Sequence, residues 1–262
     1  TSADWESSLA HLPHATLYHR APWARVLSES YQLRPLYLRL GSAEKPQGVL
    51  PLMEVSSALT GKRAVSLPFS DECEPAAVSE SAFRTLFEHA IQLGEQRGWK
   101  YLECRGGQDW IANAATSLEY YGHRVSLHED PEAILAQFHS SVRRAIRKAE
   151  QTPLTFHFSS GFESVAEFYR LFCKTRQRHG APPQPFDFYA RIQRHLLEPG
   201  NGQVALAKLG GKAVGGTLFL HDGTTVMMKF AASDLEYQHL RMNNLVLWES
   251  MRHYGQRGFK YM

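Results

Sequence analysis

The chain of 262 residues is 43% hydrophobic and 11% aromatic, which excludes a disordered protein and suffices for one large domain or two ordinary ones. Its formal net charge of +3 allows an anionic substrate but does not indicate a nucleic-acid coat protein. The cysteines Cys73, Cys104 and Cys173 form no C-x-x-C pair, so we expect neither a metal site nor redox chemistry.

The sequence shows no membrane or secretion signal. It has no run of about 18 apolar residues, and its start, TSADWESSLA, has neither the basic nor the apolar region of a signal peptide. We therefore expect no integral membrane segment, and the three widely spaced cysteines favour a reducing cytoplasm. Because the sequence begins at Thr1 rather than at a methionine, we expect that it has been trimmed and that an upstream signal would not be visible.

Hydrophobic periodicity predicts a mixed α/β first half. The expected elements are a helix at 23–31, strands at 36–40 and 48–55, a helix at 82–96 and a strand at 100–105.

The second half begins with two predicted helices, at 140–151 and 162–178. The loop HGAPPQP ends the latter helix, because Pro182 and Pro183 cannot continue it. Beyond the loop we expect a helix at 186–197, strands at 204–209, 210–223 and 224–232, and a helix at 243–255.

One short sequence occurs twice. Residues 96–102 read QRGWKYL and residues 256–262 read QRGFKYM, so five of seven positions are identical. Each copy follows a helical stretch and has a glycine, Gly98 or Gly258, where the chain leaves the helix for a strand. This repeat indicates a tandem duplication of one α/β unit. We place the boundary near residues 128–138, giving domains at 1–132 and 133–262, and expect 36–102 to superpose on 204–262.

The order of these segments resembles that of the Fem-type (FemAB-like) transferases, which carry two GNAT-like acyltransferase domains in tandem. The similar phrases are GVLPLMEV, SLPFSD, YLECR, SSVRRAIRKAEQTPLTF, FYRLFCKTRQRHGAPPQP and NNLVLWESMRHYGQRGFKYM, which span nearly the whole chain. The sequence looks closest to the branch associated with exopolysaccharide and cell-envelope biosynthesis.

The resemblance implies an α/β (α+β) fold of two GNAT-like domains and transfer of an acyl or aminoacyl group to an amine. Well-studied relatives use aminoacyl-tRNA to extend peptidoglycan peptide bridges. Two features depart from the family. Phe69 is followed by SDECEPAA rather than a glycine-rich turn, and the chain stops at Met262, so we expect the last strand to be truncated.

Acyl transfer to an amine requires donors for the developing oxyanion and a route for the lost proton. The glycines in Val214-Gly215-Gly216 would permit a bulge that exposes backbone N–H groups, or they merely relieve packing. Asp234 and Glu236 are candidate proton acceptors, unless they are ordinary solvated carboxylates.

Lys229 is a lysine among apolar neighbours on a predicted central strand, so we expect it to face a cleft and contact the substrate or the transition state. The alternative is a strand end from which the side chain reaches water. The resemblance to the Fem group, in which a basic residue on this stretch can face the acceptor, is why we rank Lys229 first. We expect Lys229 to point into a cleft shared with the basic helix at 140–151.

Basic side chains form the candidate substrate-binding surface. On the helix at 140–151 an apolar stripe leaves Arg143, Arg144, Arg147 and Lys148 on the other side. A solvated face is the alternative to a site for the phosphate of a lipid- or nucleotide-linked sugar, or for a tRNA acceptor end. Beside the Pro-rich loop, the candidates for the rim of the same cleft are Arg176 and His179.

The segment QHLRMNN at 238–244 has the spacing of the Q-x-x-G-x-G/A loop that cradles coenzyme A in many acyltransferases, but Arg241 and Asn243 occupy the glycine positions. The following helix N-terminus can still meet an anion, with Asn243, Asn244 and Trp248 as candidate binding residues. At least one of the asparagines is expected to be the N-cap. Side chains at the glycine positions would crowd a pyrophosphate.

These observations predict a transferase acting on an amine of a cell-envelope, peptidoglycan or exopolysaccharide precursor. We expect no tightly bound cofactor and a donor that is aminoacyl-tRNA or, alternatively, acyl-CoA. Other readings are a non-catalytic GNAT-fold binding protein for such a precursor, a coenzyme A-dependent N-acetyltransferase, and a nucleic-acid binder. Modest net charge counts against the last.

Overall fold

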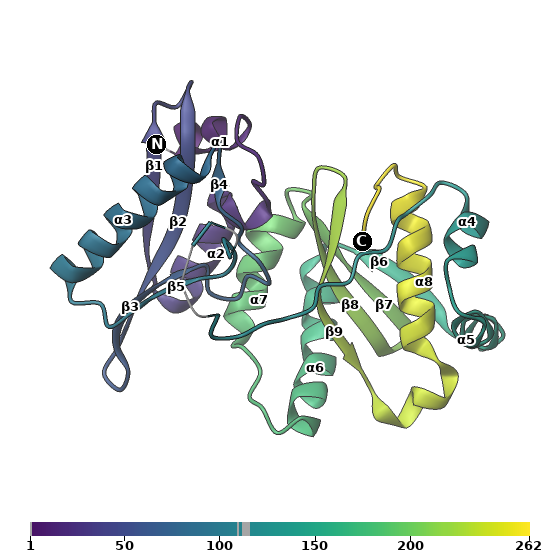
Figure 1. Ribbon diagram of the computed structural model, residues 1–262. Helices are drawn as coiled ribbons and strands as arrows, with labels where there is room; N and C mark the ends of the chain where they lie inside the picture. The colour runs from purple at the N-terminus through teal and green to yellow at the C-terminus, as the bar shows by residue number, and fades with distance from the viewer. Residues whose placement is uncertain (1, 109, 112–115) are drawn as a thin grey trace. The chain divides into compact units, whose positions relative to one another are not determined.

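The computed structural model describes residues 2–108, 110–111 and 116–262 (Figure 1). The chain divides into two compact units, Thr1–Tyr121 and Gly122–Met262. No helix within the described residues is both long and apolar enough to cross a membrane.

The first unit is a sheet with helices on its faces. Its helical elements are α1 (Ser2–Leu9), η1 (Leu17–His19), α2 (Ala21–Tyr31) and α3 (Glu80–Arg97). Its strands are β1 (Arg34–Gly41), β2 (Pro46–Ser57), β3 (Gly61–Ser66), β4 (Ala76–Ala77) and β5 (Leu102–Cys104). The sheet order is β1-β2-β3-β5, with β5 parallel to β3 and β4 paired to β2.

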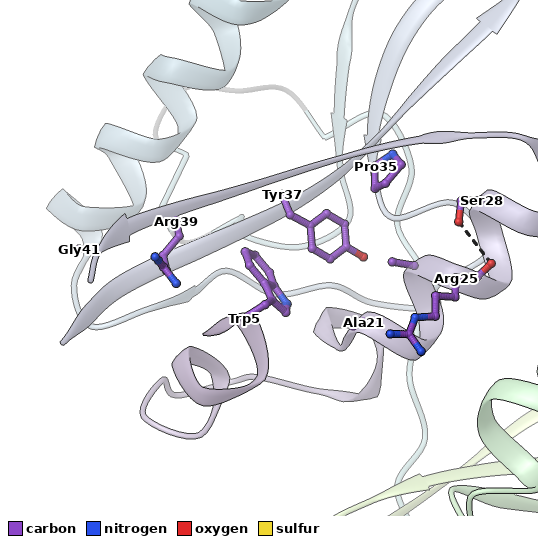
Figure 2. A pocket seen from close by; sticks show the side chains of 9 residues that line it. Trp5, Ala21, Arg25, Ser28, Pro35, Tyr37, Arg39 and Gly41 are labelled. Carbon is purple, nitrogen blue, oxygen red and sulfur yellow. Dashed lines mark hydrogen bonds between the residues drawn. The ribbon is translucent and has the colours of Figure 1, made fainter. Parts of the chain in front are cut away.

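Strand alternation divides the core of this unit. Leu36 and Leu38 pack against the cluster beneath α3, whereas Tyr37 packs against Trp5 of α1 on the other face. An open pocket lies beside this pair of rings (Figure 2).

The second unit has a four-stranded sheet of order β6-β7-β8-β9. Its strands are β6 (Thr155–Ser159), β7 (Gly202–Leu209), β8 (Lys212–Asp222) and β9 (Thr225–Ser233). Its helical elements are α4 (Pro131–Ala136), α5 (Ser140–Glu150), α6 (Phe162–Arg178), α7 (Phe186–Ile192), η2 (Gln193–Leu197), η3 (Leu235–Leu240) and α8 (Met242–Gly255).

Helices cover both faces of this sheet (Figure 1). On one face, Phe230 of β9 packs in an aromatic cluster with Phe172 of α6 and Tyr189 of α7. On the other, Phe219 of β8 packs against Tyr254 of α8, and α5 packs on the outside of α8. Helix α5 is thus separated from α6 by the sheet and α8.

The chain end joins the second sheet. The Tyr261 carbonyl accepts a 2.8 Å hydrogen bond from the Val226 N–H, and Tyr261 pairs in parallel with Thr225. Val125 and Met262 exchange two backbone hydrogen bonds of 2.8 and 2.9 Å. Residues 122–132, which we expected in the first domain, therefore pack as part of the second unit.

The duplicated sequence has the same local structure in both units. Gly98 and Gly258 take positive φ angles of 70° and 83°. The following N–H groups, of Trp99 and Phe259, donate back to Gly94 and Tyr254 at 2.9 and 3.1 Å. In each unit antiparallel strands precede a helix, and the segment after the helix pairs in parallel with one of those strands, β5 with β3 and Tyr261 with the start of β9. The predicted repeat of strand-helix-glycine order is therefore present.

Candidate active site

Strands β7 and β8 are interrupted by a bulge near the predicted glycine pair. Ala207 pairs with Gly215, but Lys208 pairs with Ala213, so Val214 is an extra residue on β8. The Val214 carbonyl accepts a 2.9 Å hydrogen bond from the Asp234 N–H. The predicted irregularity is present, and it ties β8 to the end of β9.

The two glycines beside the bulge allow close packing on both faces. A Cβ at Gly215 would lie 2.7 Å from Met242 Cγ and 3.7 Å from Asn243 Oδ1, so the first turn of α8 lies against this position. A Cβ at Gly216 would lie 2.7 Å from a Leu206 methyl group. Since neither site has room for a side chain, close packing accounts for both glycines.

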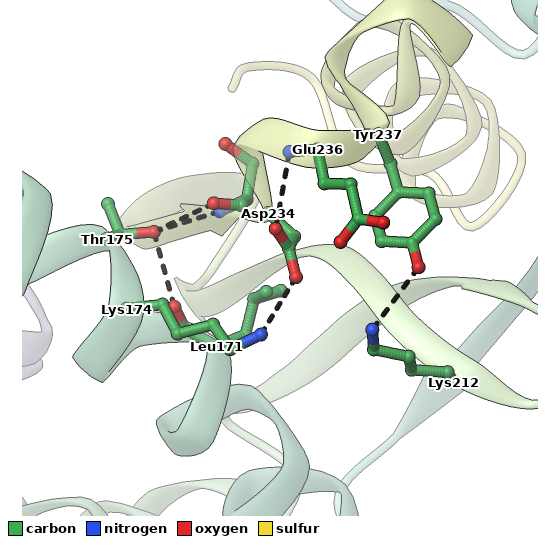
Figure 3. A network of polar contacts seen from close by, with 8 residues as sticks. Leu171, Lys174, Thr175, Lys212, Asp234, Glu236 and Tyr237 are labelled. Carbon is green, nitrogen blue, oxygen red and sulfur yellow. Dashed lines mark hydrogen bonds and ion pairs between the residues drawn. The ribbon is translucent and has the colours of Figure 1, made fainter.

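A group of polar residues, which we call the β9-end cluster, surrounds the point where β9 ends (Figure 3). Its members come from α6, β8, β9 and η3 and comprise Lys174, Thr175, Lys212, Ser233, Asp234, Glu236 and Tyr237. Thr175 fixes the strand end, because its hydroxyl donates to the Ser233 carbonyl at 3.2 Å and accepts from the Ser233 N–H at 3.1 Å.

Asp234 lies at the centre of the β9-end cluster with 9% of its surface exposed. One carboxylate oxygen pairs with Lys174 Nζ at 2.9 Å, and the other accepts from the Glu236 N–H at 3.3 Å as the N-cap of η3. The Lys174 ammonium holds the pKa of Asp234 below its ordinary value. A carboxylate so engaged is a weak base, so its observed role is to position η3.

Glu236 is exposed on the first turn of η3. Across from it, Lys212 Nζ donates to the Tyr237 hydroxyl at 3.3 Å and lies 5.0 Å from the centre of that ring. The cluster therefore presents an accessible carboxylate beside an accessible ammonium group.

Lys229 occupies a second bulge. Leu218 pairs with Phe230, but Phe219 pairs with Met228, which leaves Lys229 as the extra residue of β9. Its side chain is half-buried, and Nζ lies 5.4 Å from the centre of the Phe230 ring. The structure does not place Lys229 beside the basic helix, because the Phe230 ring packs with α6 and α7 while α5 packs on α8.

Arg241 lies at a glycine position of the Q-x-x-G-x-G/A spacing, and its backbone has the conformation that a glycine favours. It takes the left-handed conformation, with φ 59° and ψ 30°, and is itself the N-cap residue of α8. The predicted capping role of an asparagine is wrong, because α8 begins at Met242 and both Asn243 and Asn244 lie inside its first turn. Arg241 and Asn243 are exposed there, and Asn244 is half-buried.

The structure gives Trp248 a place in the core rather than on a binding surface. Its side chain is 3% exposed, and its indole N–H donates to Glu150 of α5 at 3.1 Å. Phe138 meets the ring edge-to-face, with centroids 6.5 Å apart. Trp248 therefore anchors α5 to α8, which a sequence reading of the helix start could not reveal.

The predicted basic surface on α5 is present. Ile146 and Ala149 are buried against α8, and all four basic residues of the helix, Arg143, Arg144, Arg147 and Lys148, are exposed. Within the part of the chain that the structure describes, these four form no ion pair. They lie on the opposite side of the second unit from α6 (Figure 1).

Arg176 and His179 lie at the end of α6. Arg176 donates to the Pro182 carbonyl at 3.3 and 3.4 Å and lies 6.0 Å from the centre of the Phe172 ring, so it braces the proline-rich loop. His179 is the exposed C-cap residue of the helix. Neither belongs to the α5 surface, with which we had grouped them.

Sequence reasoning missed five members of the β9-end cluster, Lys174, Thr175, Lys212, Ser233 and Tyr237. Lys174 meets Asp234 across 60 positions and Thr175 meets Ser233 across 58, so no local pattern links them. One usable signal was the placement of Lys174 and Thr175 near the end of a helix that was correctly predicted.

Comparisons with known proteins agree on the fold. Residues 136–262 match the family model described as an acetyltransferase (GNAT) domain. No curated protein matches the sequence.

Solved structures of low sequence identity cover the whole chain. A crystal structure of FemX aligns with a TM-score of 0.72 and 14% identity over 86% of its length. The C-terminal domain of a putative lysylphosphatidylglycerol synthetase from Agrobacterium fabrum aligns with a TM-score of 0.59 and 12% identity over 78% of its length. A tandem GNAT protein from the clavulanic acid biosynthesis pathway aligns with a TM-score of 0.53 and 16% identity over 84% of its length. The predicted fold of two tandem GNAT-like domains with mixed sheets flanked by helices is thus confirmed, and the second unit has a GNAT-type acyltransferase fold.

Proposed function

We propose that the chain is an acyl- or aminoacyltransferase that acts on an amine of an anionic cell-envelope, peptidoglycan or exopolysaccharide precursor. One observation carries this proposal. Within a GNAT-type fold, the β9-end cluster lies where β9 ends, beside the first turn of α8. The likeness to FemX and to the putative lysylphosphatidylglycerol synthetase supports an aminoacyl group and an envelope component.

The reaction is direct attack. The lone pair of a neutral amine adds to the acyl carbon, a C–N bond forms, and the C–O bond of an ester or the C–S bond of a thioester breaks. The amine loses a proton, which the departing oxygen or sulfur finally takes up. Two kinds of group are needed, donors for the transient oxyanion and a carrier for the proton.

We assign different roles in this reaction to different residues of the second unit. Glu236 is exposed and carries the proton, directly or through a water molecule, while Asp234 holds η3 in place through its cap and its ion pair. Lys229, half-buried against Phe230, contacts the acceptor or the developing negative charge. Arg241 and Asn243 at the start of α8 meet the donor.

For the donor we propose aminoacyl-tRNA or another large activated ester rather than a coenzyme A thioester. Arg241 keeps the left-handed backbone of a glycine, but its side chain and that of Asn243 stand at the helix N-terminus. A pyrophosphate needs close approach of backbone N–H groups there, whereas a single phosphate can use the helix dipole and the guanidinium. An aminoacyl-tRNA donor would place the reaction in the cytoplasm.

Thermal-shift titration tests this donor assignment. A ligand at 100 times its dissociation constant stabilises the native state by about 2.7 kcal/mol. We expect acetyl-CoA at micromolar concentration to give no shift. A clear shift that Arg241→Glu abolishes would contradict the assignment and favour the coenzyme A-dependent N-acetyltransferase.

The acceptor class has its own test. Native mass spectrometry of the purified chain should show a retained anionic molecule that carries a primary amine. A retained precursor without any amine would contradict the transferase proposal and favour the second candidate, a GNAT-fold protein that binds such precursors without chemistry.

A further inference from the structure

The first unit contains a pocket that no part of the proposed function uses. It encloses about 570 Å³ between α1, α2 and the face of β1 that carries Tyr37 and Arg39 (Figure 2). Two small residues of α2, Ala24 and Ser28, line it and leave this space open. All of its lining residues belong to the first unit.

One wall of the pocket is aromatic. The Trp5 and Tyr37 rings have centroids 4.7 Å apart and planes inclined by 49°. The Trp5 indole N–H donates to the His19 carbonyl at 2.7 Å, so Trp5 offers its ring but not its donor. Aromatic walls of this kind favour a flat apolar body on the ligand.

A buried hydroxyl lies at the inner end of this wall. The Tyr37 hydroxyl is inaccessible to solvent and has no hydrogen-bond partner within the described residues. Burial raises the pKa of Tyr37 well above its ordinary value, so the group is a neutral donor. A buried hydroxyl without a partner destabilises the empty pocket, and a ligand that supplies an acceptor would remove this cost.

Two arginines, Arg25 and Arg39, line the pocket on either side of the ring pair (Figure 2). Arg39 is held loosely, with Nη1 3.3 Å from the Ser8 hydroxyl and 3.5 Å from the Asp4 carbonyl oxygen. Arg25 is exposed and forms no ion pair among the described residues. No acidic residue is among those that line the pocket. The two guanidinium groups therefore favour an anionic ligand.

We propose that this pocket is a binding site for a small aromatic carboxylate, with the ring against Trp5 and Tyr37 and the carboxylate paired with Arg25 (Figure 2). The Tyr37 hydroxyl, buried in the empty pocket, donates to the ligand after the Tyr37 ring turns toward the carboxylate. The site goes beyond the proposed function, since it lies in the first unit and requires no acyl transfer.

Ligand-detected NMR of the full chain with benzoate as the probe tests the proposal. We expect saturable binding with a dissociation constant near about 1 mM, a free energy of roughly −4 kcal/mol. Inorganic phosphate, which has the charge without the ring, and benzyl alcohol, which has the ring without the charge, should both bind much more weakly. Equal binding of benzyl alcohol and benzoate, or no saturable benzoate signal, would overturn the proposal.

Variants assign the site. Arg25→Met should weaken benzoate binding about tenfold, the loss of one charge-assisted contact worth about 1.4 kcal/mol. Arg34→Met, on the same strand as Tyr37 but outside the lining, is the matched control and should bind like the wild type.

Tyr37→Phe should weaken binding while leaving the free energy of unfolding unchanged or higher, because it removes an unsatisfied hydroxyl. Urea denaturation of each variant separates loss of binding from loss of folding. If Arg25→Met and Tyr37→Phe fold and bind benzoate like the wild type, the pocket is not the site.

Discussion

Asp234 is the residue whose structural role is most fully resolved. Its side chain is 12% exposed, and it both caps η3 and pairs with Lys174, whose own side chain is 58% exposed. The cap contributes about 1 kcal/mol. The ion pair adds less than about 1 kcal/mol, because solvent screens the lysine.

Substitution separates the two contributions of Asp234. Asp234→Asn keeps a good N-cap and loses the ion pair, so it should cost less than about 1 kcal/mol, whereas Asp234→Ala loses both and should cost about 1–2 kcal/mol. Urea denaturation at neutral pH measures these differences. Equal costs for the two variants would show that the cap contributes nothing.

The same residue predicts a pH dependence. Because its pKa in the folded state is depressed, the carboxylate contributes stability at pH values above its unfolded pKa and loses it as pH falls through the folded pKa. The stability difference between the wild type and Asp234→Asn should therefore shrink as the solution is acidified. A difference that is constant between neutral pH and about pH 3 would contradict the ion pair.

Lys229 gives the sharpest catalytic prediction at this scale. Lys229→Met keeps the stem that packs near Phe230 and removes the ammonium group, so it should lower transfer more than about tenfold, over about 1.4 kcal/mol of transition-state stabilisation, with little change in folding. Lys260→Met, an exposed lysine of the same unit, is the matched control and should leave turnover unchanged. Unchanged turnover in Lys229→Met would remove this residue from the site.

At the scale of elements, α5 carries four exposed basic side chains that form no ion pair within the described residues. Arg143 and Arg147 lie one turn apart on its exposed side, so both can meet one phosphate backbone. Changing both to Gln should weaken binding of tRNA and reduce the salt dependence by about 0.7 per lost contact for a single-stranded end. Filter binding at several salt concentrations measures the slope.

Arg34→Gln in the first unit is the control for that experiment and should leave the slope unchanged. An unchanged slope in the Arg143 and Arg147 double variant would mean that α5 is a solvated face.

Helix α8 depends on a glycine near its end. Alanine is ordinarily the better helix former by about 1 kcal/mol, but a Cβ at Gly255 would lie 2.3 Å from the His128 carbonyl oxygen. Gly255→Ala should therefore destabilise the chain by about 1–3 kcal/mol. Gly122→Ala, where a Cβ meets nothing within 4 Å, should change stability by less than about 0.5 kcal/mol. Denaturation midpoints that move equally would contradict this packing.

Most elements were predictable where periodicity and breakers act locally. The helix predicted at 162–178 coincides with α6, because an apolar face and the proline-rich loop define it. Strand β6 was missed, since five residues with partners in β7 some 45 or more positions away carry too short a pattern. Helix α1 was missed because its apolar periodicity is weak.

The site was less predictable than the fold. The bulge at Val214 could be foreseen from its glycines, which are a local signal. The ion pair of Asp234 with Lys174 could not be foreseen, because Lys174 reaches Asp234 only when α6 packs on the sheet. Trp248 was misread for the same reason, since its partner Glu150 comes from a helix 98 positions earlier.

In the molecule as a whole, the two units share one order of antiparallel strands, a helix and a final parallel segment, and they differ in the elements that come before these strands. The second unit adds β6, α6 and α7 before the shared strands, and these elements bring Lys174 and Thr175 to the end of β9. The corresponding position of the first unit is occupied by α1, η1 and α2, which instead form the pocket beside Trp5 and Tyr37. The shared plan thus accounts for the fold, and the residues that α6 brings to the end of β9 are the reason why we assign chemistry to the second unit.

The most direct test of that assignment is a transfer assay with the full chain. Isotope-labelled aminoacyl-tRNA and labelled acetyl-CoA are each incubated with amine-bearing, nucleotide-linked envelope precursors, and the acceptors are analysed by mass spectrometry. We predict that an acceptor gains one acyl group as an amide from aminoacyl-tRNA, and that Lys229→Met lowers this product more than about tenfold while Lys260→Met does not. An acceptor that binds the chain yet stays unmodified with every donor would contradict the account.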